Sequence, residues 1–375
     1  MNKTLKLAVA AALLAGASSA NAGISIPAGD WTLDIGGIVN AYYTHTSFSG
    51  DDATAGEFGD GSSVANITTG LLPNYIVVSG KTRQNDLDVG FTVSINPGAS
   101  TTDAGHQGSQ QENRQAFLTF GDASWGSIKI GKDLGIYASD AILNDQTLLG
   151  VGWGAGALAG NTTTLGRIGR GFVYADWKSQ IAYSSPNFNG LNFTVGLTQA
   201  FGSAQDRAGS QTAYEAKASY SWTGDVAGKI WVSGISQNVE TQGDRASAFD
   251  IGTSITTGAF GLVGYYNAGE GVGTTVQSFS AYEANGDAID SEDWYVQASY
   301  TIPAGTKLAA SFGESTLESA AGDTVADMFT IGAYHPITKH LNLVAEYSIA
   351  EDDDEAAGGA TVKAKTISLG AIMFF

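Results

Sequence analysis

The sequence predicts an all-β fold, a closed antiparallel transmembrane β-barrel of about 16 strands. Three observations favour it: an apolar strand at the end of the chain, many segments that alternate between apolar and polar residues, and connections that are alternately short and long. A lipid bilayer admits only helices and closed barrels, because no water is present there to pair with open backbone groups. Alternating strands without long apolar helices therefore indicate a barrel.

The first 22 residues have the pattern of a secretory signal peptide. Two lysines precede an apolar run over residues 7–17, and Ala20-Asn21-Ala22 is a small-residue cleavage site. The run is too short for a membrane-spanning helix, which needs roughly 20 apolar residues. We expect cleavage after Ala22, export through the periplasm, and a single barrel domain over residues 23–375.

Period-two alternation, together with its spacing along the chain, predicts about sixteen strands. Their expected spans are 30–46, 74–83, 86–96, 113–121, 126–132, 178–185, 190–200, 212–222, 227–239, 246–257, 259–268, 293–302, 305–316, 325–335, 339–350 and 361–375. Short turns and long loops alternate between these strands, as they do between the two rims of an outer-membrane barrel. A soluble β-sandwich or β-helix is the alternative, but neither requires this alternation of connection lengths.

The last ten residues form the clearest strand. One face of this strand is apolar and consists of Ile367, Leu369, Ala371, Met373 and Phe375. A soluble protein that exposed such an edge would be prone to aggregate. In a barrel the last strand pairs with the first, and its apolar face contacts lipid. The segment therefore indicates the outer membrane of a Gram-negative cell.

The composition excludes several classes of function. The chain has no Cys, which excludes a disulfide framework and Cys-based metal or redox sites. Its formal net charge of −19 excludes nucleic acid as a partner, because the phosphates would be repelled. The four His residues are scattered, and the sequence has no zinc, nucleotide-loop or serine-hydrolase motif. We therefore expect no metal, no cofactor and no enzymatic activity.

The longest connection, over residues 133–177, is the most informative loop. It carries Leu148, Leu149, Trp153 and Leu158, and is too apolar for a freely solvated excursion. Loops of this length are usually functional, and a barrel of about sixteen strands leaves a water-filled lumen. We expect the loop to fold inward, pack on the wall and narrow the lumen. The alternative is an external flap packed against a neighbouring subunit.

Several segments resemble a known family, the Gram-negative general diffusion porins. Residues 113–121 (NRQAFLTFG) and 125–132 (WGSIKIGK) are similar to the family's paired fourth and fifth strands. Gly166-Arg167-Ile168-Gly169 and residues 183–191 (YSSPNFNGL) resemble the end of its third loop and the hairpin that follows. The terminal Phe375 resembles its assembly signal. The likeness covers the signal peptide, the middle third and the C-terminus.

The resemblance implies a homotrimer of 16-stranded barrels that passes small hydrophilic solutes and ions passively. It also implies partners in the membrane: outer-membrane lipid, lipopolysaccharide, and the barrel assembly machinery that recognises Phe375. In the family the third loop folds into the lumen, where its carboxylates face a basic cluster on the wall. Opposed charges across a narrow lumen create a transverse field, which orients polar solutes.

By position, Asp140 and Asp145 are the acidic residues on the loop side of this constriction. The basic candidates on the wall side are Lys81, Arg83, Arg114, Lys129, Lys132 and Arg167. The alternative for each cation is a solvated charge at a rim or in a loop. That alternative is strongest for Lys132, which follows the parity of Ile128 and Ile130.

The acidic run over residues 351–355 is a possible divalent-cation loop, with Asp352, Asp353 and Asp354 as its ligands. A bound cation could bridge the loop to anionic surface glycolipid. The alternative is a solvated loop, and the spacing does not match an EF-hand.

Three other functions compete with general diffusion. Trp153 and Tyr137 could form a sliding surface for sugars in a solute-selective channel. A barrel enzyme would need a carboxylate or Ser–His constellation at the rim, and the sequence offers none. A barrel adhesin would act through its loops.

Overall fold

The computed structural model describes residues 23–50, 61–99, 111–154, 163–200, 212–239, 245–275, 281–355 and 358–375. The predicted signal peptide, residues 1–22 with its cleavage site after Ala22, lies outside the described residues. The same holds for Leu158 and the rest of residues 155–162 in the longest loop.

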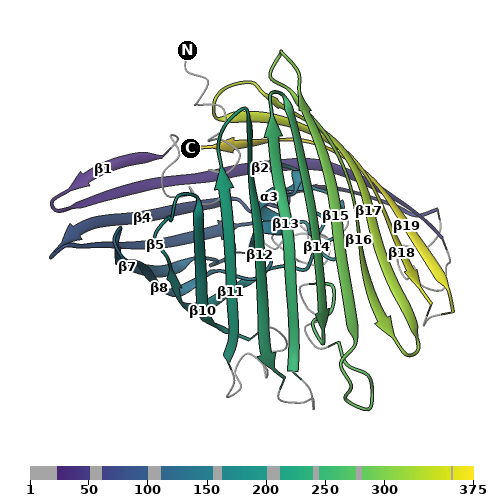
Figure 1. Cartoon of the computed structure of the whole chain (residues 1–375). Helices are drawn as coiled ribbons and strands as arrows, with labels where there is room; N and C mark the ends of the chain where they lie inside the picture. The colour runs from purple at the N-terminus through teal and green to yellow at the C-terminus, as the bar shows by residue number, and fades with distance from the viewer. Residues whose placement is uncertain are drawn as a thin grey trace.

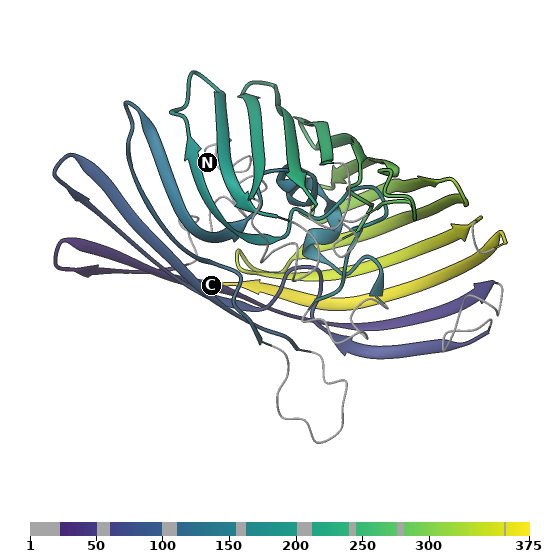
Figure 2. The ribbon, with the colours of Figure 1, turned by 90° about the horizontal axis from the view of Figure 1, so that it is seen from below.

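In the part of the chain that the structure describes, one sheet contains nineteen antiparallel strands, of which sixteen close into a ring (Figures 1 and 2). The ring strands are β2 (Trp31–Gly50), β4 (Tyr75–Gln84), β5 (Leu87–Pro97), β7 (Ala116–Asp122), β8 (Gly126–Leu134), β9 (Trp177–Ser184), β10 (Leu191–Gln199), β11 (Thr212–Trp222), β12 (Val226–Asn238), β13 (Arg245–Thr257), β14 (Phe260–Glu270), β15 (Asp290–Thr301), β16 (Lys307–Ser319), β17 (Gly322–Pro336), β18 (Leu341–Asp354) and β19 (Ala360–Phe374). The prediction of a closed 16-stranded antiparallel barrel is confirmed.

Three short strands add to the ring without being part of it. They are β1 (Ile24–Ala28), β3 (Ser63–Thr68) and β6 (Gln111–Glu112), which pair with β2, β2 and β5 respectively. The strand β3 lies between the predicted spans 30–46 and 74–83, where a long loop was expected, so that this expectation was wrong. The upper part of β2 runs beyond its neighbour β4, and β3 pairs with that extension.

The two ends of the chain close the barrel. β19 pairs along β2 from Val362 opposite Gly50 to Phe374 opposite Ile38, and in Figure 2 the yellow strand lies beside the purple one. The amide N–H of Gly37 donates to the Phe375 carbonyl oxygen at 2.8 Å. The predicted pairing of the last strand with the first is therefore present, and it leaves β19 without an open edge.

The wall has one apolar and one polar face, as the alternation predicts. On β19, Leu369 is 53% exposed, whereas its neighbours Ser368 and Thr366 on the other face are 1% exposed. The exposed apolar side chains form the outer face, which meets lipid in an outer-membrane barrel. Aromatic pairs lie towards both ends of this band on β14–β16: Phe260 with Tyr300, and Trp294 with Phe312. Such aromatic girdles are typical of the two membrane interfaces.

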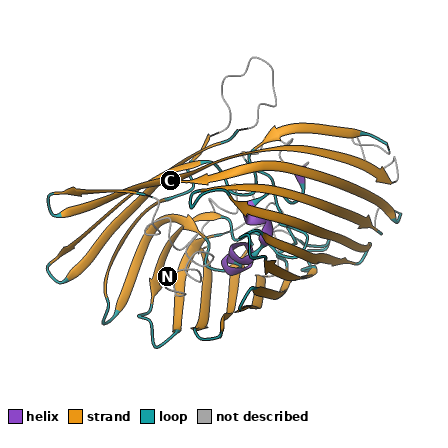
Figure 3. Ribbon diagram, turned by 90° about the horizontal axis from the view of Figure 1, so that it is seen from above, coloured by secondary structure: helices purple, strands orange, loops and turns teal. Residues whose placement is uncertain are grey.

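Within the described residues of the connection between β8 and β9, two short helices are present (Figure 3). They are α3 (Ser139–Asn144) and the 3-10 helix η3 (Gln146–Leu149). Among the described residues, no helix is both long enough and apolar enough to cross a membrane.

Candidate functional site

The connection between β8 and β9, here called the loop segment (residues 135–176), contacts the polar face of the wall. The Tyr137 hydroxyl donates to Asn267 Oδ1 on β14 at 2.5 Å, and the Gln146 amide donates to Gln297 Oε1 on β15 at 2.6 Å. Asn267 and Gln297 are buried, and they alternate along their strands with exposed Tyr266 and Val296 on the apolar face. The loop segment therefore lies against the side of the wall that faces away from lipid.

An apolar cluster reinforces these hydrogen bonds. Ile142, Leu148 and Val151 of the loop segment are buried in one cluster with wall side chains such as Trp231 and Tyr295. The apolar character of the loop, read from the sequence, thus has a packing partner. Burial of a large apolar side chain typically stabilises by about 1.5–3 kcal/mol.

Asp140, on α3, makes the most direct contact between an acidic loop residue and basic wall residues. Its carboxylate forms ion pairs with Lys217 Nζ on β11 at 3.1 Å and with Lys229 Nζ on β12. The Asp140 side chain is 4% exposed, whereas those of Lys217 and Lys229 are 27% and 31% exposed. Burial by itself raises the pKa of the Asp140 carboxyl, but attraction by the two lysines and their hydrogen bonds outweigh burial, so that this pKa lies below its usual 3.8.

Asp145 lies beside the fully buried Arg167, with 3.7 Å between Asp145 Oδ1 and Arg167 Nε. The Arg167 guanidinium donates to the Met328 carbonyl oxygen at 2.6 Å and to Ser311 Oγ. Asp145 also accepts the amide N–H of Thr147 at 3.2 Å, which caps the start of η3. The pair thus joins the outgoing and returning parts of the loop segment and ties them to β16 and β17.

Two wall glutamates that are not among the predicted site residues hold the backbone of the loop segment. Glu215 Oε2 on β11 accepts the amide N–H groups of Ile136 at 2.7 Å and Tyr137 at 2.8 Å. Glu346 Oε2 on β18 accepts those of Val151 at 2.7 Å and Gly152 at 2.9 Å.

The alternation of polar and apolar residues could have shown that Glu215 and Glu346 belong to the polar face of the wall. Glu215 and Lys217 alternate with Tyr214 and Ala216, so both charges belong to the polar face of β11. Charges on that face avoid lipid, where Arg or Lys costs about 2–4 kcal/mol at the midplane. What the alternation could not show is that these side chains reach the loop segment.

Comparison with known proteins identifies the family. A family model described as Gram-negative porin matches residues 8–355. The chain belongs to the Gram-negative porin family. No curated protein matches the sequence.

Solved structures agree on the fold. The anion-selective porin from Comamonas acidovorans is 16% identical, with a TM-score of 0.65 over 92% of this chain and 100% of that one. The outer membrane channel DcaP of Acinetobacter baumannii is 15% identical, with a TM-score of 0.65 over 95% and 100% of the two chains. OmpF of Salmonella typhi, in complex with daunomycin, is 16% identical, with a TM-score of 0.61 over 94% and 100%. This porin is therefore a diffusion channel of the outer membrane.

Most of the other predicted cations have acidic partners other than Asp140 and Asp145. Lys81 is paired with Asp34 at 3.2 Å and is 63% exposed. Arg83 bonds Asp88 at 2.9 Å and Asp122 at 2.8 Å beside two short turns. Both cations lie on the polar face, as expected, but near the short-turn end of their strand.

Lys129 also lies on the polar face, where it pairs with Asp133 and lies 4.9 Å from the centre of the Phe117 ring. Arg114 precedes β7, is buried, and donates to Glu112 Oε2 at 2.6 Å. Each of these cations thus has an acidic neighbour close to it in the sequence.

Two assignments to the basic wall were wrong. Lys132 stands opposite Ala116 and Ser179 and shares the face of Ile130, which is the apolar outer face. The reason is strand parity, because a residue two positions from Ile130 must lie on the same side. Arg167 belongs to the loop segment, not to the wall, since it lies between Gly152 and β9 in the return of the loop.

The predicted cation loop at Asp352, Asp353 and Asp354 was also wrong, because these residues lie in β18 and pair with β17 and β19. Asp352 Oδ2 bonds the Arg170 guanidinium at 2.7 Å, and Asp353 Oδ1 accepts the Thr361 hydroxyl at 2.5 Å. Successive strand residues point to opposite faces, so the three carboxylates do not converge. Within the described ranges, no group of three or more potential metal ligands is present.

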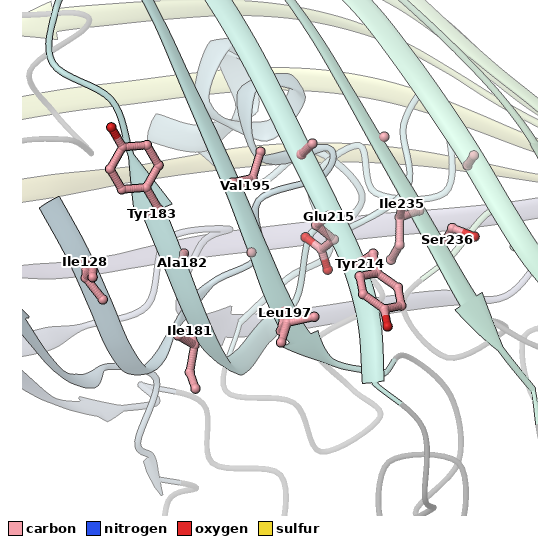
Figure 4. A pocket seen from close by; sticks show the side chains of 14 residues that line it. Ile128, Ile181, Ala182, Tyr183, Val195, Leu197, Tyr214, Glu215, Ile235 and Ser236 are labelled. Atoms are coloured by element: carbon pink, nitrogen blue, oxygen red, sulfur yellow. The ribbon is translucent and has the colours of Figure 1, made fainter. Parts of the chain in front are cut away.

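A hollow of about 720 Å³ lies on the wall over β8 to β13 (Figure 4). Many of its lining side chains belong to the apolar outer face, among them Ile181, Leu197 and Tyr214. It therefore opens toward the lipid side.

The two aromatic residues predicted to form a sliding surface for sugars do not form one together. Tyr137 is fully buried, and the Arg170 guanidinium lies over the ring of Trp153, 4.7 Å from the ring centre.

Proposed function

We propose that this porin passes small hydrophilic solutes and ions by passive diffusion, and that the loop segment folds into its lumen and narrows it. The observation that carries the proposal is the contact of Asp140 with Lys217 and Lys229 on the polar face of the wall. In a closed ring the face opposite the lipid side is the luminal one. A segment docked on that face reduces the cross-section open to solutes.

The constriction is charged, but its ion pairs touch instead of facing each other across a gap. Because Asp140 is buried between two partly exposed lysines, a passing solute meets the ammonium groups more readily than the carboxylate. The Asp145–Arg167 pair is buried completely and acts as a structural tie. We infer that Lys217 and Lys229 contribute more to the local field than the acidic loop residues do.

The assembly we propose is a homotrimer in outer-membrane lipid and lipopolysaccharide. One solved structure with this fold, OmpT of Vibrio cholerae, is described as a trimer form. We further propose that the signal peptide is removed after Ala22 and that the assembly machinery recognises Phe375. The porin family supports a channel without enzymatic activity.

Recording in a planar bilayer tests this function. The purified trimer should give a large, ohmic conductance that closes at high voltage, and a silent membrane would contradict the proposal. Reversal potentials in a salt gradient should shift in the direction of cation selectivity in the double variant Lys217→Gln with Lys229→Gln. Asp140→Asn should shift them in the direction of anion selectivity. Lys81→Gln, at the short-turn end, is the matched control and should leave them nearly unchanged.

A further inference from the structure

Glu215 and Glu346 hold the loop segment at two separate places in the same way. Each carboxylate accepts two consecutive backbone amides, Ile136 and Tyr137 at one place and Val151 and Gly152 at the other. Consecutive amides that converge on one oxygen form a small anion-binding cradle. We call the contact of Glu215 the first clamp and that of Glu346 the second clamp.

Small residues make room for both clamps. A Cβ atom on Gly150 would overlap the Glu346 carboxylate, so glycine there lets the carboxylate reach the backbone. Gly196, which stands opposite Glu215, leaves space for Ile136: a Cβ atom on it would lie 2.7 Å from Ile136 Cδ1. The sequence at both places is therefore fitted to the wall glutamates.

The two clamps differ in the partners of their carboxylates, because Glu215 has a cationic partner and Glu346 has a neutral one. Glu215 forms an ion pair with Lys178, which is 1% exposed, and also accepts the Thr198 hydroxyl at 2.6 Å. Glu346 Oε1 accepts the Tyr334 hydroxyl at 2.6 Å, and no ion pair to Glu346 exists in the part of the chain that the structure describes. Release of the first clamp would perturb a buried ion pair, which is strongly unfavourable. Release of the second clamp would give one carboxylate back to water.

We propose that Glu215 is a permanent anchor of the loop segment and Glu346 a releasable latch, both acting as positioning residues for the constriction. This rests on the proposed function, since it assigns the loop segment its place in the lumen. When the latch opens, Val151 and Gly152 move away from Glu346, while Gln146 stays bonded to Gln297 and the segment stays attached at residues 136 and 137. The channel then samples conductance levels other than that of the docked state.

A reversible disulfide tests the latch. The chain has no cysteine, and the overlap of a Gly150 Cβ with the Glu346 carboxylate places Cys side chains at both positions within bonding reach. The variant G150C with E346C is recorded before and after reduction in the same bilayer. Oxidised, it should be as quiet as wild type. Reduced, it should populate altered levels at least about tenfold more often, because two charge-assisted hydrogen bonds are absent.

The controls distinguish a failure of folding, a failure of the latch hypothesis and a failure of the proposed channel function. E346C alone should be insensitive to reductant, and resistance of the trimer to dissociation in detergent reports folding. If G150C with E346C does not fold, Glu346→Gln gives the same comparison at almost unchanged side-chain volume. Equal noise in the oxidised, reduced and wild-type channels would overturn the latch while leaving the channel function intact. A silent wild type would instead overturn the proposed function.

The anchor needs a different pair of variants. Glu215→Gln leaves Lys178 buried opposite a neutral amide, so the loop segment should undock and the altered levels should dominate. Lys178→Met with Glu215→Gln removes the unpaired buried lysine and should quiet the openings only in part, because a neutral amide holds the two backbone amides more weakly than the carboxylate does. A single variant that behaves like wild type, or a double variant as noisy as the single one, would overturn the anchor.

Discussion

The wall of this porin and its loop segment are held together by different kinds of interaction. Each wall strand pairs with neighbours on both sides through several backbone hydrogen bonds, and its side chains alternate between lipid and the polar interior. The loop segment contains the short helices α3 and η3 and depends on single contacts such as Asp140 with Lys229 and Glu346 with Val151. Repeated local pairing tolerates the loss of one contact, whereas a docked segment with few anchors does not.

The largest effect should come from breaking a buried ion pair in the loop segment. Arg167→Met leaves the Asp145 carboxylate buried beside an apolar side chain, which typically costs about 3–5 kcal/mol. We expect the segment to undock and become cleavable by protease while the barrel remains folded. Arg245→Met, at an exposed guanidinium on β13, is the control and should leave the cleavage pattern unchanged. A protease-resistant Arg167→Met would show that the pair contributes little.

A charge in the apolar band should damage the wall itself. Val296→Arg places a guanidinium on the outer face between Trp294 and Tyr300, at a cost of about 2–4 kcal/mol if the site lies near the midplane. Unfolding in urea with lipid vesicles measures the loss. Glu292→Arg, on the same strand and face beyond Trp294, should cost less than about 1 kcal/mol. Equal losses for the two variants would contradict the assignment of the lipid band.

Acid should weaken the docking of the loop segment through Asp140. Because its folded-state pKa is depressed, its contribution is present in full above the unfolded pKa of about 3.9 and is lost as the pH falls through the lower folded value. Protease cleavage of the segment should therefore stay constant from neutral pH to about 5 and increase only below about 4. Asp140→Asn should remove this component of the pH dependence. An unchanged pH profile in that variant would assign the acid response to other groups.

The smallest effect is expected at the exposed end of the wall. Lys81→Gln removes an ion pair with Asp34 in which the lysine is 63% exposed, and such pairs contribute about 0–1 kcal/mol. Urea unfolding should place the variant within that range of wild type. A larger loss would mean that the short-turn rim is more rigid than its exposure indicates.

The sequence by itself determined the wall. Sixteen strands, their order and the apolar face of β19 follow from period-two alternation, because lipid on one side and water on the other act on every residue locally. The placement of Lys132 on the outer face was also available from its parity with Ile130. The pairing of β3 with the extension of β2 could not be predicted, since no local pattern shows that β2 extends beyond β4.

Only the tertiary structure decided how the loop segment is held. The acidic residues Asp140 and Asp145 stood out by position, but Lys217 and Lys229 meet Asp140 only through the docking of the loop segment on the wall, and Arg167 meets Asp145 only through the fold of the loop segment itself. Glu346 reaches the amide of Val151 across 195 positions of the chain. No local pattern encodes such a contact, because its geometry depends on the shear and closure of all the strands between them.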